Sequence, residues 1–125
     1  MTAPQKPAVD IVDGPLPTDL VTEDLTVGEG AEAKPGDNVA VHYVGVSQST
    51  AAEFDNSYDR GQPLRFGLGA GQVIAGWDSG VTGMRVGGRR RLVIPPHLGY
   101  GARGAGGVIA PNETLVFVCD LVAVG

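Results

Sequence analysis

The sequence is poor in cysteine, histidine and aromatic residues, and the first two shortages exclude classes of chemistry. Of 125 residues, one is cysteine and two are histidine. The lone Cys119 cannot form an internal disulfide, and its place in an apolar run favours a buried, inert thiol over a nucleophile. His42, His97 and Cys119 show none of the short paired spacings of zinc sites. We therefore expect no metal and no cofactor.

Long apolar runs are also missing. No stretch approaches the roughly 20 apolar residues of a membrane span, and no basic segment followed by an apolar one opens the chain. Together with the single thiol, these features predict a cytoplasmic protein without a membrane partner. A chain of this length suits one domain that buries about two thirds of its unfolded surface. Nothing indicates an obligate oligomer, so we expect a monomer.

Basic residues are scarce in the first half of the chain and gathered in the second. Residues 1–60 hold eleven acidic side chains against three basic ones, whereas residues 61–125 hold six arginines against three acidic side chains. Arg85 and the arginine triplet 89–91 are compatible with phosphate or nucleic-acid contact. The net charge of −5 instead favours a solvated outer strand face for them. We therefore expect no nucleic-acid partner.

Alternating apolar residues predict several strands. Residues 38–46 place Val39, Val41 and Tyr43 on one side, which is typical of a strand buried on at least one face. Similar signals predict strands at 20–26, 64–68, 89–94 and 114–124. Small polar residues at 47–53 indicate a loop or bulge.

One segment has helical spacing. Val73, Trp77, Val81 and Met84 recur at steps of four, four and three, so they share one helix face. The glycines between them each weaken a helix by roughly 1 kcal/mol relative to alanine, so we expect packing against a sheet to hold it. An antiparallel sheet curled around one short helix, in the α+β class, is the predicted fold.

The first residues differ from the rest. Residues 1–18 carry four prolines and little periodicity, which predicts an extended arm ahead of a domain at 19–125. Val9, Ile11 and Val12 are the apolar residues that would dock this arm.

The chain has seven aromatic residues, and six of them fall in separate segments beside glycines or strand-like runs. These six are Tyr43, Phe54, Phe66, Trp77, Tyr100 and Phe117. Rings spread over six segments suggest a shared cavity instead of one aromatic stripe. Residues 67–71 lack the spacing of a nucleotide loop, and Ser79 falls on the predicted helix without a suitable base. An aromatic pocket with few ionisable groups suits a reaction without covalent chemistry.

Nine short segments, taken in order, resemble the FKBP family of peptidyl-prolyl cis-trans isomerases. They are VHYVG (41–45), FD (54–55), LRFGLG (64–69), VIAGW (73–77), GVTGM (80–84), VG (86–87), LVIP (92–95), YGA (100–102) and TLVF (114–117). The resemblance implies a five- to six-stranded antiparallel half-barrel wrapped around one short helix, with a proline pocket between them. It also implies an enzyme that accelerates rotation of X–Pro bonds in protein folding or regulation.

The same resemblance assigns roles to the pocket residues. Trp77 would form the floor under a proline ring. The walls would be Tyr43, Phe54, Phe66 and Phe117, with Val73 and Ile74 at the rim. The Ile74 N–H and the Tyr100 hydroxyl would donate to ligand carbonyls, and the Gln72 carbonyl would accept.

Residues at the margin of the implied pocket complete this assignment. Asp55 would face the edge, near Tyr43, Arg60 and Tyr100. Leu64 stands where many family members have an aromatic residue, and Ala105 where some carry a histidine. Val108 and Ile109 keep apolar side chains at the far end of the following loop.

The implied partners are proline-containing peptides and unfolded protein chains, with macrolides such as tacrolimus and rapamycin as inhibitors. Because Leu64 and Ala105 differ from the residues that many family members carry at the pocket margin, a second hypothesis stays open. In it, the protein is a proline-peptide binding module with vestigial catalysis. A measured isomerisation rate on a short peptide distinguishes the two.

Overall fold

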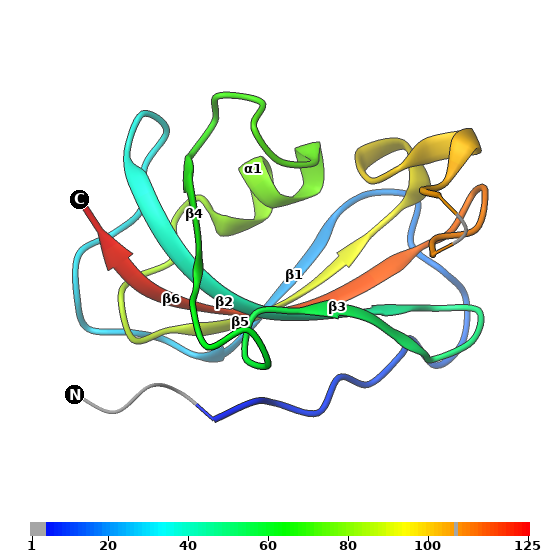
Figure 1. The fold of residues 1–125 in the computed structure, drawn as a ribbon, viewed down its shortest axis with the longest axis horizontal. Helices are drawn as coiled ribbons and strands as arrows, with labels where there is room; N and C mark the ends of the chain where they lie inside the picture. Colours follow the sequence, from blue (N-terminus) through cyan, green and yellow to red (C-terminus); the bar gives the residue numbers. More distant parts are fainter. Residues whose placement is uncertain (1–4, 107) are drawn as a thin grey trace.

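A curved antiparallel sheet of six strands carries one α-helix over its concave face in the computed structural model, which describes residues 5–106 and 108–125 (Figure 1). The strands are β1 (Val21–Thr26), β2 (Asn38–Ser47), β3 (Glu53–Asn56), β4 (Leu64–Gly67), β5 (Arg89–Ile94) and β6 (Leu115–Val124). The helix is α1 (Ala75–Val81), and two 3-10 helices follow β5, η1 (Pro96–Leu98) and η2 (Gly101–Arg103). The predicted fold class is confirmed.

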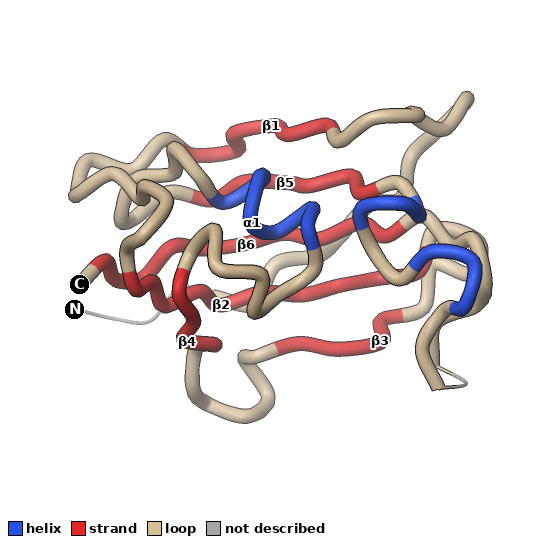
Figure 2. Tube along the Cα trace, turned by 90° about the horizontal axis from the view of Figure 1, so that it is seen from above, coloured by secondary structure: helices blue, strands red, loops and turns tan. Residues whose placement is uncertain are grey.

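The two longest strands form the centre of the sheet. The strand order is β1-β5-β6-β2-β3, and β4 also pairs with β2 (Figure 2). Strand β4 pairs with the beginning of β2, at Asn38 to Val41, and β3 pairs with its end, at Val44 to Val46. Two short strands therefore share one edge of β2, and the segment 57–63 connects them. Within the described ranges, no helix is long and apolar enough to cross a membrane.

Strand β3 is absent from the sequence prediction. The loop expected at 47–53 is shorter in the structure, because β2 extends to Ser47 and β3 begins at Glu53. Three of the four residues of β3 are polar, so its sequence carries no apolar alternation. Its pairing with β2 also contains a register shift between Gly45 and Val46, which places a bulge beside Asp55.

Glycines bring α1 unusually close to the sheet. The helix spans seven residues, so Val73 and Met84 lie just outside it. A Cβ atom on Gly76 would lie 2.6 Å from Cγ2 of Ile94, and one on Gly80 would lie 2.8 Å from Cδ1 of Leu92. These glycines weaken the helix locally but permit the backbone to pack directly on β5, which sets the height of Trp77 above the sheet.

The described part of the arm, residues 5–18, has no helix or strand and runs along the outer face of the sheet (Figure 1). Val9 and Val12 pack against a small cluster of buried valines, Val46, Val93 and Val116. Ile11, the third expected docking residue, stays 38% exposed. The division between arm and domain at residue 18 stays a prediction.

Side chains of β5 and of the turn after β2 hold the backbone of the arm. Gln48 accepts a hydrogen bond from the Val12 N–H (2.7 Å) and donates one to the Val12 carbonyl (2.9 Å). Arg89 donates to the Gln5 carbonyl and Arg91 to the Asp10 carbonyl. The arm is thus attached through its main chain as well as through the side chains of Val9 and Val12. The main-chain contacts leave no sequence pattern.

The arginine triplet is paired inside the molecule. Two arginines meet aspartates, Arg89 with Asp120 and Arg90 with Asp24, at 2.7 Å each. Arg91 lies 4.0 Å from a Glu23 oxygen. The arginine triplet therefore has partners within the protein itself.

Candidate functional site

A hollow of about 240 Å³ lies between α1 and the sheet. Five aromatic side chains line it: Tyr43, Phe54, Trp77, Tyr100 and Phe117. Five further residues complete the lining: Asp55, Leu64, Gln72, Val73 and Ile74. Strands β2, β3, β4 and β6, the helix and two connecting segments each contribute, so ten of the residues that the sequence suggested meet in one place.

The rings around Trp77 pack edge to face. The Trp77 indole is 3% exposed, and its centroid lies 4.8 Å from Tyr43 at 83° and 5.4 Å from Phe117 at 86°. Phe54 meets Phe117 in the same way, at 5.5 Å and 88°. Such pairs stabilise a defined arrangement beyond the burial of their area. The buried Trp77 Nε1 has no hydrogen-bond acceptor among the described residues.

Phe66 supports this arrangement from the side. Its ring is buried and lies 5.8 Å from the Trp77 indole, but it does not line the hollow. The structure therefore places Phe66 next to the expected floor and not in the wall where the resemblance put it.

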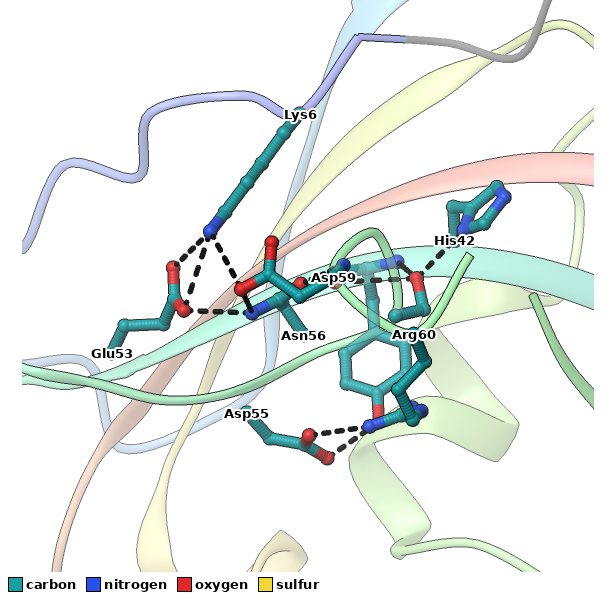
Figure 3. A network of polar contacts seen from close by, with 9 residues as sticks. Lys6, His42, Glu53, Asp55, Asn56, Asp59 and Arg60 are labelled. Atoms are coloured by element: carbon teal, nitrogen blue, oxygen red, sulfur yellow. Dashed lines mark hydrogen bonds and ion pairs between the residues drawn. The ribbon is translucent and has the colours of Figure 1, made fainter. Parts of the chain in front are cut away.

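A polar triangle closes one edge of the hollow. The Tyr43 hydroxyl donates to Asp55 Oδ2 at 2.5 Å. Arg60 donates from Nη2 to the Tyr43 hydroxyl and from Nη1 to Asp55 Oδ1, at 2.8 Å each. Figure 3 shows Asp55 and Arg60 facing one another, on the other side of the strand from Lys6 and Glu53. The carboxylate is thus oriented by two donors while its side chain stays 44% exposed.

Burial keeps the phenols of the site protonated. It raises the pKa of Tyr43 to about 12, helped by the hydrogen bond that Tyr43 donates to Asp55. Burial and the charge of Asp55 also raise the pKa of Tyr100. Both hydroxyls therefore remain proton donors through neutral pH.

We expect the folded protein to lose stability as the pH rises from about 10 to about 12. A raised pKa means that the folded state keeps a phenolic proton which the unfolded chain releases near pH 10, so unfolding becomes more favourable with increasing pH. Titration of tyrosinate absorbance, run beside urea unfolding, measures both effects. Tyr43→Phe should remove one of the late-titrating groups. Ionisation of all three tyrosines near pH 10 in the folded protein would contradict the expectation.

Gly45 is a residue of this site that the sequence analysis missed. A Cβ atom at this position would lie 2.6 Å from Phe117 Cε1 and 2.7 Å from Phe54 Cζ. Glycine inside a strand often marks such a close approach, and this signal was present in the run 41–45. The absent side chain lets the two phenylalanine rings lie against the β2 backbone.

Gly45→Ala should therefore displace these rings and reduce the free energy of unfolding by about 1–3 kcal/mol, the usual cost of overpacking. Urea unfolding measures the loss, and Trp77 fluorescence reports the shifted rings. Gly67→Ala is the matched control, because its Cβ would meet nothing closer than 3.4 Å. Equal stability of the two variants would show that the rings yield without cost.

Behind Tyr43, a buried polar cluster fixes the strand. Ser57 Oγ accepts from the Tyr43 N–H at 2.7 Å and lies 2.8 Å from Nδ1 of His42. The seventh aromatic residue, Tyr58, stacks on His42 and donates to Asp120. His42 is thus a buried, hydrogen-bonded strand residue, as expected. Sequence reasoning missed Ser57.

The turn before α1 is tied to the helix by Asp78. This carboxylate accepts from the N–H groups of Gly69 and Gly71, at 2.9 and 3.1 Å. Gln72 accepts from the Gly67 N–H through its side chain. These bonds position the rim residues Val73 and Ile74. Gly69 and Gly71 both adopt positive φ, a conformation that glycine readily takes in tight turns.

Three expected site residues lie elsewhere or at the margin. Arg60 borders a neighbouring hollow, described below, and reaches the first one through its bonds to Tyr43 and Asp55. Val108 and Ile109 line a different hollow, together with Glu113. Val108 is 60% exposed and Ile109 is buried. Across the described residues, no group of three or more potential ligands is arranged to hold a metal ion.

Comparison with known proteins places this geometry in a family. Residues 29–122 match the model of the FKBP-type peptidyl-prolyl cis-trans isomerase family. The chain is 63% identical over 121 residues to an FK506-binding protein of Streptomyces anulatus, covering 96% of this chain and 98% of the relative. It is 52% identical over 119 residues to a probable FK506-binding protein of Corynebacterium glutamicum, covering 95% and 98%.

Solved structures show the same likeness. The crystal structure of AtFKBP13 is similar with a TM-score of 0.79 and 40% identity, covering 88% of this chain and 96% of that chain. The crystal structure of FkpA from Escherichia coli is similar with a TM-score of 0.77 and 41% identity, covering 96% of this chain and 53% of that one.

Proposed function

Because the chain belongs to the FKBP-type peptidyl-prolyl cis-trans isomerase family, we propose that its aromatic hollow takes up the proline of an X–Pro segment and accelerates rotation of the preceding bond. The rotation proceeds without a covalent intermediate. The observation that supports this proposal most directly is the hollow itself, with five rings and a single carboxylate in its lining.

The chemistry requires only that a rotation be made faster. Amide resonance gives the peptide bond a rotation barrier of about 18–20 kcal/mol. At X–Pro bonds the cis and trans isomers differ by only about 0.5–1 kcal/mol, and their uncatalysed exchange takes tens to hundreds of seconds. A catalyst therefore needs to stabilise the twisted transition state and leaves the equilibrium unchanged.

The apolar lining favours that transition state. A twisted amide loses its resonance, so its carbonyl is less polarised than that of the planar form. Water stabilises the planar form better for the same reason. Replacing water by Phe54, Trp77 and Phe117 removes this preference and lowers the barrier relative to solution.

Polar groups at the rim would select the geometry. Among the described residues, no backbone hydrogen bond uses the Ile74 N–H, so it is available to a ligand carbonyl. Tyr100 keeps its phenolic proton and can donate a second bond. Holding both flanks of the bond restricts the substrate to orientations near the twisted state. Asp55 either interacts with the rotating carbonyl dipole or orders Tyr43 and Arg60.

The ligands of this site are proline-containing peptides and unfolded chains, and macrolides such as tacrolimus and rapamycin as inhibitors. The names of the relatives support macrolide binding, since they are called FK506-binding proteins. The hollow of about 240 Å³ is smaller than the roughly 300–1,000 Å³ of pockets for drug-sized ligands. A macrolide would thus place one ring inside and rest on the rim, where Leu64 lies.

A protease-coupled assay on an X–Pro tetrapeptide tests the proposal, with and without tacrolimus. We expect isomerisation faster than the uncatalysed rate and inhibition by the macrolide. Binding of the peptide without any acceleration would instead support the binding module with vestigial catalysis.

A further inference from the structure

A second hollow adjoins the aromatic one. It is bordered by Arg60, Gln62, Pro63, Leu64 and Arg65, and Leu64 lines both hollows. These residues belong to β4 and to the connection that leads into it from β3 (Figure 2). An extended peptide advances about 3.3 Å per residue. A chain with its proline in the aromatic hollow can therefore place a side chain one to three residues away in the second one.

The charge around the two hollows is opposite to that of the whole protein. The charged residues that line them are Arg60, Arg65 and Asp55, a net charge of +1, whereas the chain carries −5. No carboxylate lines the second hollow. The one carboxylate of the first already accepts hydrogen bonds from Tyr43 and Arg60.

Both arginines have unused donors. Within residues 5–106 and 108–125, no hydrogen bond or ion pair joins the Arg65 side chain to another residue, in contrast to the paired triplet at 89–91. Arg60 gives one bond from each terminal nitrogen and is half exposed. A guanidinium group has about five N–H donors in a planar fork, so several remain free. Each such fork matches the geometry of a carboxylate, and both arginines line the second hollow.

We propose that this enzyme prefers X–Pro segments that carry an acidic side chain one to three residues from the proline, and that Arg65 is the residue that determines this preference. The proposal rests on the proposed function of the aromatic hollow. Arg60 belongs to the polar triangle with Tyr43 and Asp55, so changing it would also disturb the site of isomerisation. Arg65 lies outside this triangle and can be changed to test charge recognition alone.

Matched peptides test the preference. Each shares one X–Pro core and carries either Glu or its neutral isostere Gln, at one position among the three before and the three after the bond. We expect one position at which kcat/KM for the Glu peptide exceeds that for the Gln peptide by about two- to fivefold at low ionic strength, as for exposed ion pairs. Because the Debye length falls to about 3 Å at 1 M salt, the ratio should approach one there.

Variants of Arg65 locate the effect. Arg65→Gln should bring the Glu/Gln ratio to one while the Gln peptide keeps its kcat/KM. Arg65→Glu should reverse the preference toward a Lys peptide. Arg103→Gln is the matched control, because Arg103 also has no side-chain partner in the part of the chain that the structure describes and lies by the separate hollow of Val108. This variant loses the same charge and should keep the ratio.

Two results would overturn the inference: a Glu/Gln ratio of one at every position in an active enzyme, or an equal loss of the ratio in Arg65→Gln and Arg103→Gln. An equal loss in both variants would show that the preference comes from the overall electrostatic field of the protein surface and not from Arg65. Absence of isomerisation with every peptide would instead refute the proposed function itself, so the two failures are distinguishable.

Discussion

Trp77→Ala should remove most of the isomerase activity and about 3–5 kcal/mol of the free energy of unfolding, the range typical of a buried tryptophan or phenylalanine replaced by alanine. The indole is 3% exposed and contacts the rings of Tyr43, Phe66 and Phe117. Its removal opens a cavity at the floor of the hollow, where water can then solvate the planar amide. Urea unfolding and the protease-coupled rate measure the two losses.

A milder substitution separates the fold from the catalytic surface. Trp77→Phe keeps an aromatic ring above the sheet, so we expect a smaller loss of stability and an intermediate rate. Because α1 packs on β5 through Gly76 and Gly80, the helix should remain in place in this variant. Full activity of Trp77→Ala in a folded protein would contradict the proposed role of the indole.

Asp55→Ala should lower kcat/KM by about ten- to hundredfold while the protein remains folded. Hydrogen bonds to charged groups are worth about 1.5–3 kcal/mol, and each 1.36 kcal/mol corresponds to about a factor of ten. The substitution leaves the Tyr43 hydroxyl and the Arg60 guanidinium without their shared acceptor. Because the carboxylate is 44% exposed, the effect on stability should be small. Thermal unfolding and kinetics together check this outcome.

Two further variants distinguish the possible roles of the Asp55 carboxylate. Asp59→Ala is the matched control, since Asp59 pairs with Lys6 on the other side of the strand and is 69% exposed. It should keep the rate. Asp55→Asn retains an acceptor oxygen but loses the charge. A normal rate for Asp55→Asn would show that the residue only orders the site, whereas a low rate assigns it an electrostatic role. A normal rate for Asp55→Ala would exclude both.

Much of the fold was predictable because burial leaves a pattern. The alternation in β2 and the step of four from Trp77 to Val81 reflect faces that pack on the core. Strand β3 has no such pattern, since it is short, polar and half exposed. Only its pairing with β2 makes it a strand. The ends of α1 were also overestimated, because Val73 and Met84 pack on the core without being helical.

The rings of the site were predictable for another reason: the sequence has few aromatic residues, and they match a family pattern in order. Residues that act through backbone contact were not. Gly45 functions by lacking a side chain, and Ser57 and Asp78 bond to N–H groups 14 and 7–9 residues away. Such contacts depend on the folded path of the chain. Arg65 was assigned no role, because the role proposed for it rests on its having no side-chain partner among the described residues.

The attachment of residues 5–12 beneath the sheet has a practical consequence. This segment is hydrogen-bonded by Gln48, Arg89 and Arg91 on the face of the sheet that points away from α1. The aromatic hollow lies on the other face of the sheet, between it and the helix. A cargo domain, a fluorophore or a resin attached through this segment would lie on the face of the sheet that points away from the hollow. Protein immobilised in this way would keep the entrance of the aromatic hollow free.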